Sequence, residues 1–347
     1  LDGLRFDAVH AISEQDFLVE LAETIRTQIA PERHIHLVLE NEGNTASLLN
    51  PQQFTAQWND DWHNVLHVLM TGEQEGYYSD FVDDATPRLA RCLSEGFIFQ
   101  GHTSRHGHSR GEPSAHLPPT AFVAFLQNHD QTGNRALGER LNVLTDADSL
   151  AAAEVLLLLS PMIPLLFMGE EWGATQPFLF FTEHNENLAQ AVREGRRAEF
   201  ADFSAFIDEK SRERIPDPNA LTTFEASIPD FAAREKPPFA ACLARYRTLL
   251  ALRHQHIVPR LAGAEALEAN VLGDKAVLAR WRMKDGTQLV IALNLGQQPA
   301  ATPGLGVGQL LYETSDGVAK AAESGRMPPR AAAAWLRDNP GEEEVSA

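Results

Sequence analysis

The feature that most constrains this chain is a repeated unit: a short apolar stretch that ends at a carboxylate. Residues 4–6 run into Asp7, residues 35–39 run into Glu40, and residues 121–127 run into a polar group that contains Asp130. Helix-like segments separate the stretches, which favours parallel strands whose ends lie at one edge of a sheet. Chemistry in α/β folds is found at that edge. The sequence therefore predicts an α/β fold that gathers these carboxylates.

The segments between these strands carry helix signals. Ser13 is a good N-cap, and an apolar stripe of Phe17, Leu21, Ile25 and Ile29 follows it until Pro31. We also expect a short strand through Trp58. A helix over about 63–70, closed by Gly72, and another over 89–99 should follow.

Residues 150–168 are apolar enough to suggest a membrane span, but they contain Glu154, Pro161 and Pro164. Because proline interrupts a helix, we predict a buried helix to Ser160 and a strand over 163–168. Glu170 and Glu171 follow that strand. It would be a fourth strand that ends in acidic residues.

The rest of the chain divides into three parts. Residues 176–238 are charged and rich in proline, and we expect an irregular insertion there, followed by a helix over 239–256. From 258 the pattern alternates, and 284–287 has the composition of a hairpin turn. We therefore predict an α/β part over 1–257, a small antiparallel β-sandwich domain over 258–347, and a frayed acidic end over 341–347.

Composition limits the classes of partner. The 347 residues carry a net charge of −19, which argues against nucleic acid and anionic membranes as partners. Cys92 and Cys242 form neither a disulfide framework nor a zinc pattern, so we expect a reducing, cytoplasmic location. The chain opens directly on a strand without a lead-in. We expect it to be the C-terminal part of a longer protein.

Several candidate sites can be weighed from the residues alone. Arg5 shares a strand face with Asp7, so it would keep that carboxylate ionised, although a strand-end ion pair without function fits equally well. The polar loop over 101–119 holds four histidines, namely His102, His106, His108 and His116. Their spacing is fixed by no strand or helix, so we predict no metal site and expect instead a mobile loop over the site.

Three of these stretches also resemble signature regions of a known family. They are Leu4 to His10, Leu37 to Glu40 and Phe125 to Asp130, and they are similar to regions of the α-amylase family of retaining glycoside hydrolases. Further stretches resemble one member of that family most closely, at 56–63, 71–81, 177–184 and 215–218. The resemblance implies a (β/α)8 TIM barrel whose fourth strand begins at Leu4, substrates that are α-1,4-glucans, and no metal or organic cofactor.

The resemblance also implies roles for individual residues. Asp7 would be the nucleophile, Glu40 the acid/base, and Asp130 the carboxylate that holds the 2- and 3-hydroxyls of the sugar at the cleavage point. Arg5 would orient Asp7, and His129 would bond the same sugar. The weaker candidates for substrate contacts are His10, Asp60, Asp61, His63, Gln131 and Asn134.

Two alternatives stay open at this point. The chain could belong to a related α-glucan enzyme, such as a branching or debranching enzyme. It could also be a glucan-binding protein whose site has lost activity, although the presence of all three carboxylates argues against that loss. The sequence leaves the oligomeric state open.

Overall fold

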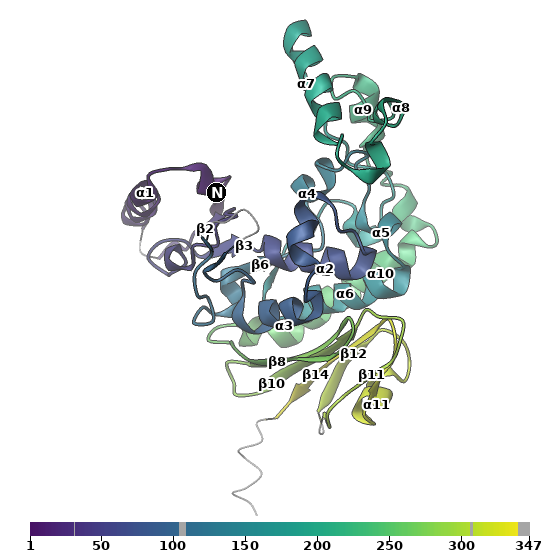
Figure 1. Cartoon of the computed structure of the whole chain (residues 1–347). Coiled ribbons are helices and arrows are strands. Elements are labelled where there is room, and N and C mark those ends of the chain that lie inside the picture. The colour runs from purple at the N-terminus through teal and green to yellow at the C-terminus, as the bar shows by residue number, and fades with distance from the viewer. Residues whose placement is uncertain (31, 104–108, 306–307, 339–347) are drawn as a thin grey trace, which may run out of the picture.

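A parallel sheet forms the first part of the molecule. The structure is a computed structural model that describes residues 1–30, 32–103, 109–305 and 308–338. Five parallel strands lie side by side in sequence order (Figure 1), namely β1 (Gly3–Phe6), β2 (His36–Leu39), β3 (Ala56–Trp58), β6 (Phe122–Ala124) and β7 (Ile163–Pro164). The predicted parallel order is confirmed. The strand predicted over 163–168 is shorter than expected.

Helices connect these strands or follow the last of them. The longer ones are α1 (Gln15–Gln28), α2 (Asp60–Thr71), α3 (Ala85–Glu95), α6 (Ala147–Leu159) and α10 (Phe239–Leu252), and two short ones, α4 (His129–Gly133) and α5 (Leu141–Leu144), follow β6. The helix predicted before Ser160 is α6, whose residues from Ala152 to Leu159 are all buried. Among the described residues, no helix combines the length and the apolar character needed to cross a bilayer.

The predicted apolar stripe of α1 is wrong at Phe17 but right at Ile25 and Ile29. Phe17 is 51% exposed, whereas Leu18 and Ala22 are fully buried, with Ile25 and Ile29 packed against the same core. A stripe spaced by four residues drifts about 40° per step, since a helix turns about 100° per residue. The buried face follows the 3.6-residue period instead. Ser13 is not the N-cap either, because the helix is capped at Glu14 without a side-chain hydrogen bond.

Two other predicted helices begin earlier than expected. Asn59 caps α2, since its side chain accepts a hydrogen bond from Trp62 N, and Gly72 ends the helix with φ 75° as predicted. Helix α3 ends before Gly96, which adopts φ 90°. A Cβ atom there would lie 2.0 Å from the Phe122 ring, so glycine is required at this position.

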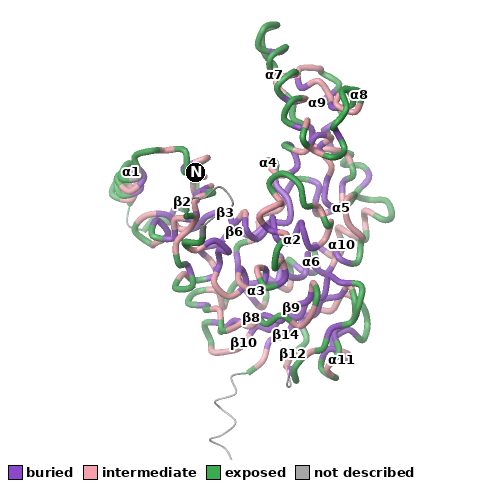
Figure 2. The backbone as a smooth tube through the Cα atoms, viewed as in Figure 1, coloured by how far each residue is buried: buried purple, intermediate pink, exposed green. Residues whose placement is uncertain are grey.

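The segment predicted to be irregular contains helices. Residues 176–238 include α7 (Glu186–Glu199), α8 (Glu209–Arg212) and α9 (Leu221–Ala226), which stand as an arm beyond α4 (Figure 1). Figure 2 shows that much of this arm is exposed. Helix α7 was missed because its sequence is mostly polar and charged, so that few apolar side chains mark the face it buries. Its N-cap is Asn185, which accepts from Leu188 N.

The loop over 101–119 is also partly ordered into strands. β4 (His102–Thr103) pairs with β5 (Ser109–Arg110) in a short antiparallel hairpin. His106 and His108 lie outside the described residues. Among the described residues, no group of three or more histidine, cysteine, aspartate or glutamate side chains is placed to hold a metal ion.

An antiparallel sheet forms the C-terminal part. Its spatial order is β12 (Gln309–Glu313), β14 (Ala331–Arg337), β10 (Gln288–Asn294), β9 (Ala276–Arg282) and β8 (Glu265–Gly273). The predicted turn at 284–287 joins β9 to β10, and Met283 N donates to Thr287 O at 2.8 Å. Strand β8 was not predicted. Against the sheet also lie α11 (Val318–Glu323) and a small pair of strands, β11 (Ala300–Ala301) and β13 (Arg326–Met327).

Helices of the first part rest on this antiparallel sheet (Figures 1 and 2). α3 contacts β8 and β9, and α6 contacts β10 and β14. Trp281 is fully buried and donates through Nε1 to Leu93 O at 3.2 Å. Lys275 reaches across to the end of α2, where its Nζ donates to Leu69 O at 2.7 Å. The two parts therefore share one continuous apolar core.

Candidate active site

Arg5 gathers the three predicted carboxylates. Its Nη1 lies 2.8 Å from Asp7 Oδ1, and its Nη2 lies 3.8 Å from Asp130 Oδ2 and 4.0 Å from Glu40 Oε2. These residues follow β1, β2 and β6, so the parallel sheet brings together groups that are far apart in sequence. We call Arg5, Asp7, Glu40 and Asp130 the Arg5 cluster. Among the described residues, none hydrogen-bonds Arg5 Nε or Nη2.

The backbone turn after Asp7 links Asp7 to Glu40. Ala8 adopts φ 45°, a left-handed conformation that is uncommon for a residue other than glycine. In that conformation its N–H donates to Glu40 Oε2 at 2.5 Å. Asp7 is therefore followed by a strained residue that fixes the Glu40 carboxylate. Strain of this kind is concentrated at functional sites.

The ring of Trp58 packs against the guanidinium group of Arg5. The guanidinium carbon of Arg5 lies 4.0 Å from the centroid of the Trp58 ring, and the tryptophan is buried. Such a contact is attractive and also fixes the plane of the guanidinium group. The His129 ring lies 6.0 Å from the same tryptophan, and His129 Nε2 lies 3.5 Å from Asp130 Oδ2. His129, a predicted sugar contact, therefore lies beside Asp130 and Trp58.

The local sequence explains why Asp130 points into the site. Asn128 caps α4, because its side chain accepts from Gln131 N at 2.8 Å. Asp130 lies in the first turn of that helix, where a carboxylate is favoured by the helix dipole. Gln131 then reaches back, and its Nε2 donates to Asp60 Oδ1 at 3.4 Å.

Asp60 is a fourth carboxyl group at the same edge of the sheet. It is half-buried at the start of α2, directly after β3, and β3 lies between β2 and β6 in the sheet. Burial raises the pKa of Asp60 to about 7, the negative charges of Glu40, Asp61 and Asp130 act in the same direction, and Arg110 opposes them. Asp60 therefore holds a proton at a pH where an exposed aspartate is ionised.

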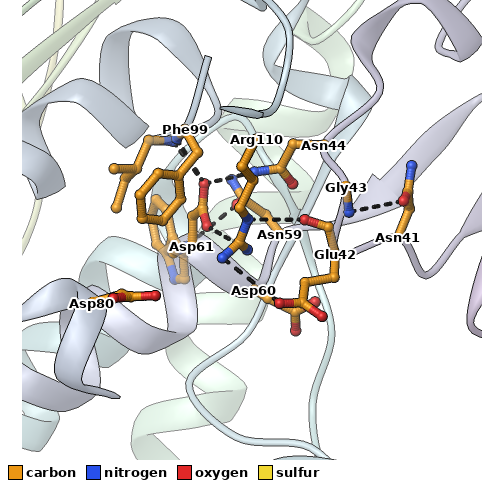
Figure 3. A network of polar contacts seen from close by, with 12 residues as sticks. Asn41, Glu42, Gly43, Asn44, Asn59, Asp60, Asp61, Asp80, Phe99 and Arg110 are labelled. Carbon is orange, nitrogen blue, oxygen red and sulfur yellow. Dashed lines mark hydrogen bonds and ion pairs between the residues drawn. The ribbon is translucent and has the colours of Figure 1, made fainter. Parts of the chain in front are cut away.

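Its neighbour Asp61 has a different environment (Figure 3). Asp61 is fully buried, and its Oδ2 accepts from Ile98 N, Phe99 N and Asn44 Nδ2 at 2.8, 3.2 and 2.8 Å. Arg110 Nη2 lies 3.3 Å from the other oxygen. We call Asp61 with these partners the Asp61 cluster. It anchors the β4–β5 hairpin and the chain after α3, and leaves the carboxylate no free face for a ligand.

His63 is likewise buried. Its Nδ1 is bonded to Leu126 O at 2.8 Å, and burial lowers the pKa of His63 to about 3, so the ring is neutral. Next to it, His67 Nε2 lies 2.7 Å from Glu73 Oε2, and Arg135 forms two hydrogen bonds to the same carboxylate at 2.7 and 2.8 Å. This group ties the end of α2 to the chain after α4, which carries Asp130.

The remaining candidates lie at the rim. His10 is exposed, and its Nδ1 accepts from Glu42 N at 3.3 Å. Asn134 is exposed at the end of α4, where its N–H donates to Asp130 O at 2.9 Å.

Glu170, which follows the fourth predicted strand, is buried away from the carboxylates and accepts from Tyr246 OH at 2.9 Å. Burial raises the pKa of Glu170 to about 8.

The sequence reasoning missed three features in and around the site. Trp58 was placed at the end of a strand, but nothing indicated that it would lie under Arg5. The left-handed turn at Ala8 had no signal at all, because alanine is not a residue type associated with that conformation. The link among Glu73, His67 and Arg135 was also missed, since it depends on contacts between residues 62 positions apart.

Curated relatives match nearly the whole chain. A malto-oligosyltrehalose trehalohydrolase from Rhizobium sp. (strain M-11) is 38% identical over 97% of this chain and 57% of its own length. One from Deinococcus radiodurans is 39% identical over 86% of this chain and 49% of its own length. The chain therefore spans about half the length of the curated relatives that it matches.

Solved structures agree with these matches. A putative alpha amylase from Salmonella typhimurium is 42% identical, with a TM-score of 0.87 over 97% of this chain and 57% of that chain. A debranching enzyme from Nostoc punctiforme, at 16% identity and a TM-score of 0.55 over 96% of this chain and 58% of that chain, shares the fold alone. Residues 264–335 match a domain of unknown function, DUF3459.

Proposed function

We propose that the chain belongs to the α-amylase family of glycoside hydrolases and that it supplies the catalytic carboxylates of a malto-oligosyltrehalose trehalohydrolase, in line with its similarity to curated proteins of that name. In this proposal, the five parallel strands are the fourth to eighth of a (β/α)8 barrel, residues 258–347 form its C-terminal β domain, and the protein is cytoplasmic. The substrate is a maltooligosyltrehalose, and the bond cut is the α-1,4 bond next to its terminal trehalose. The observation that carries the chemistry is the gathering of three carboxylates around Arg5.

The reaction proceeds in two displacements with net retention. Asp7 attacks the anomeric carbon while Glu40 donates a proton to the leaving oxygen. Trehalose departs, and the remaining glucan is held as a glycosyl–Asp7 ester. Water then attacks the same carbon, and Glu40 takes its proton, which restores both carboxyl groups. Arg5 orients Asp7 for the first of these attacks, since its Nη1 lies 2.8 Å from Asp7 Oδ1.

Other residues bind the sugar rather than react. Asp130 and His129 hold hydroxyls of the sugar at the cleavage point, and bonds that strengthen in the transition state accelerate the reaction. His10, Gln131 and Asn134 lie at the rim of the site as further contacts. We assign no substrate contact to Asp61 or His63, since both are buried and their hydrogen bonds are made within the protein.

Support for this specificity comes from the named relatives, since the three carboxylates are shared across the wider family. A trehalose leaving group has no free reducing end. A site with polar groups set for its hydroxyls rejects analogues that leave those groups unpaired.

The test uses the full-length protein with maltotriosyltrehalose and maltopentaose side by side. We expect a clear preference in kcat/KM for maltotriosyltrehalose, with trehalose released and the new reducing end formed first as the α anomer by NMR. Equal rates on the two substrates would contradict the specificity. Formation of α-1,6 branches from amylose would favour a branching enzyme, and glucan binding without turnover would favour a binding protein.

A further inference from the structure

The four carboxyl groups at the sheet edge do not have equal access to positive charge. Arg5 lies within 4.0 Å of Asp7, Glu40 and Asp130. Arg110 forms its ion pairs with Asp61 and Glu42. In the part of the chain that the structure describes, no cation forms an ion pair with Asp60. Of the four carboxyl groups, Asp60 is therefore the one whose negative charge is least compensated by a cation among the described residues.

The groups that face Asp60 come from every element around it. Glu40 follows β2, Asp61 is its neighbour on α2, and Asp130 lies on α4, while Arg110 from β5 is the opposing charge. Repulsion from three carboxylates and partial burial both favour the neutral acid. One oxygen, Oδ1, accepts from Gln131 Nε2. The other oxygen, Oδ2, has no hydrogen-bond partner among the described residues, so we place the proton of the neutral acid there.

We propose that Asp60 is a specificity-determining residue that binds substrate as a neutral carboxylic acid, donating a hydrogen bond from Oδ2 to a sugar oxygen beside the cleaved bond. The proposal rests on the proposed function and deepens it. Its place next to Glu40 and Asp130 sets Asp60 where the sugar on either side of that bond is recognised. A neutral acid suits this place, because it donates a hydrogen bond without adding a fourth negative charge.

Two substitutions separate the neutral acid from the carboxylate. Asp60→Asn keeps the shape and one donor but cannot ionise, whereas Asp60→Ala removes the donor. At neutral pH we expect kcat/KM on maltotriosyltrehalose to fall about threefold for Asp60→Asn and about 20-fold or more for Asp60→Ala. Asp84→Asn is the matched control, since Asp84 is exposed away from the site and its left-handed backbone, φ 53°, suits asparagine.

A titration gives a readout that a structural role would not move. In the full-length protein with 13C-labelled aspartate, NMR should show a carboxyl group that titrates near pH 7 and is absent from Asp60→Asn. The ratio of wild-type to Asp60→Asn kcat/KM should fall as the pH rises through about 7, because only the wild-type residue loses its proton.

The results that overturn the proposal are distinct from failure of the proposed function. If the wild type prefers maltotriosyltrehalose but Asp60→Asn is as impaired as Asp60→Ala, Asp60 acts as a carboxylate. If Asp60→Ala retains wild-type kcat/KM, Asp60 contacts no substrate. Thermal unfolding of each variant identifies any loss due to misfolding, and in that case the NMR titration of the wild type decides alone. Inactive wild-type protein would instead contradict the proposed function.

Discussion

The Arg5 cluster and the Asp61 cluster are built from the same residue types but satisfy them differently. In the Arg5 cluster, one arginine faces three carboxylates, Asp7 is 73% exposed, and two guanidinium nitrogens lack hydrogen-bond partners among the described residues. In the Asp61 cluster, one buried carboxylate accepts from three N–H groups and from Arg110. The Arg5 cluster keeps hydrogen-bonding atoms that are not satisfied within the protein and can act on a ligand. The hydrogen bonds of the Asp61 cluster are made within the protein, and this cluster stabilises the fold.

The largest expected effect is a loss of kcat on substitution of Asp7, with little loss of stability. Asp7→Asn should lower kcat of the full-length protein by on the order of 10⁴, because the amide is a poor nucleophile. Its free energy of unfolding should change by less than about 1 kcal/mol, since Asp7 is an exposed partner in its ion pair. Steady-state kinetics and urea unfolding measure the two quantities. A large loss of stability would place Asp7 with the structural group.

Glu40→Gln should act on the same reaction but depend on the substrate. We expect kcat to fall about 10²- to 10⁴-fold on maltotriosyltrehalose, since general acid catalysis contributes about that much. An activated aryl glycoside needs no proton on its leaving group, so its cleavage should slow far less. Equal losses on the two substrates would remove Glu40 from the role of acid.

Asp61→Ala should show the opposite pattern. Removing one partner of a buried ion pair destabilises a protein by about 3–5 kcal/mol, because the remaining charge and donors stay buried. The folded fraction should keep kcat within a few-fold of wild type. Glu42→Gln is the matched control, since it removes the other and exposed partner of Arg110. If Asp61→Ala lowered kcat without lowering stability, Asp61 would have a catalytic role like the residues of the Arg5 cluster.

The smallest effect concerns Glu73, whose pKa is lowered to about 2 by Arg135 and His67 against the effect of burial. Because the folded pKa lies below the unfolded one, this contribution to stability is present above about pH 4.5 and is lost as the pH falls toward 2. Glu73→Gln should cost about 1 kcal/mol at pH 7, given that the side chain is a third exposed.

Unfolding free energies of wild type and Glu73→Gln should therefore converge between pH 4.5 and pH 2. A constant difference over that range would mean that Glu73 stabilises the fold by packing and not by charge.

Local patterns predicted what depends on neighbouring residues. The strand ends that carry Asp7, Glu40 and Asp130 were found because apolar strands and their terminal carboxylates are adjacent in sequence, and the parallel order followed from the connecting helices. The turn at 284–287 was found for the same reason. The predicted face of α1 was wrong at Phe17, because a four-residue spacing is only an approximation to the helix period.

Contacts between distant residues could not be read in this way. Adjacent Asp60 and Asp61 look alike in the sequence, yet one faces the site and the other is buried against Phe99 and Arg110. Which of two neighbouring carboxylates points inward depends on the chain after α3 and on the β4–β5 hairpin. The stacking of Trp58 on Arg5 likewise depends on two strands that are not adjacent in the sheet.

Helix α2 connects the candidate active site to the antiparallel sheet. Its first residues are Asp60 and Asp61, and near its last turn Leu69 O is held by Lys275 of the antiparallel sheet. Twelve residues of helix form a rigid rod about 18 Å long. The C-terminal sheet thus supports the end of this helix that lies away from the site. The position of Asp60 and Asp61 at the start of α2 therefore depends in part on where the C-terminal sheet holds the other end of the helix.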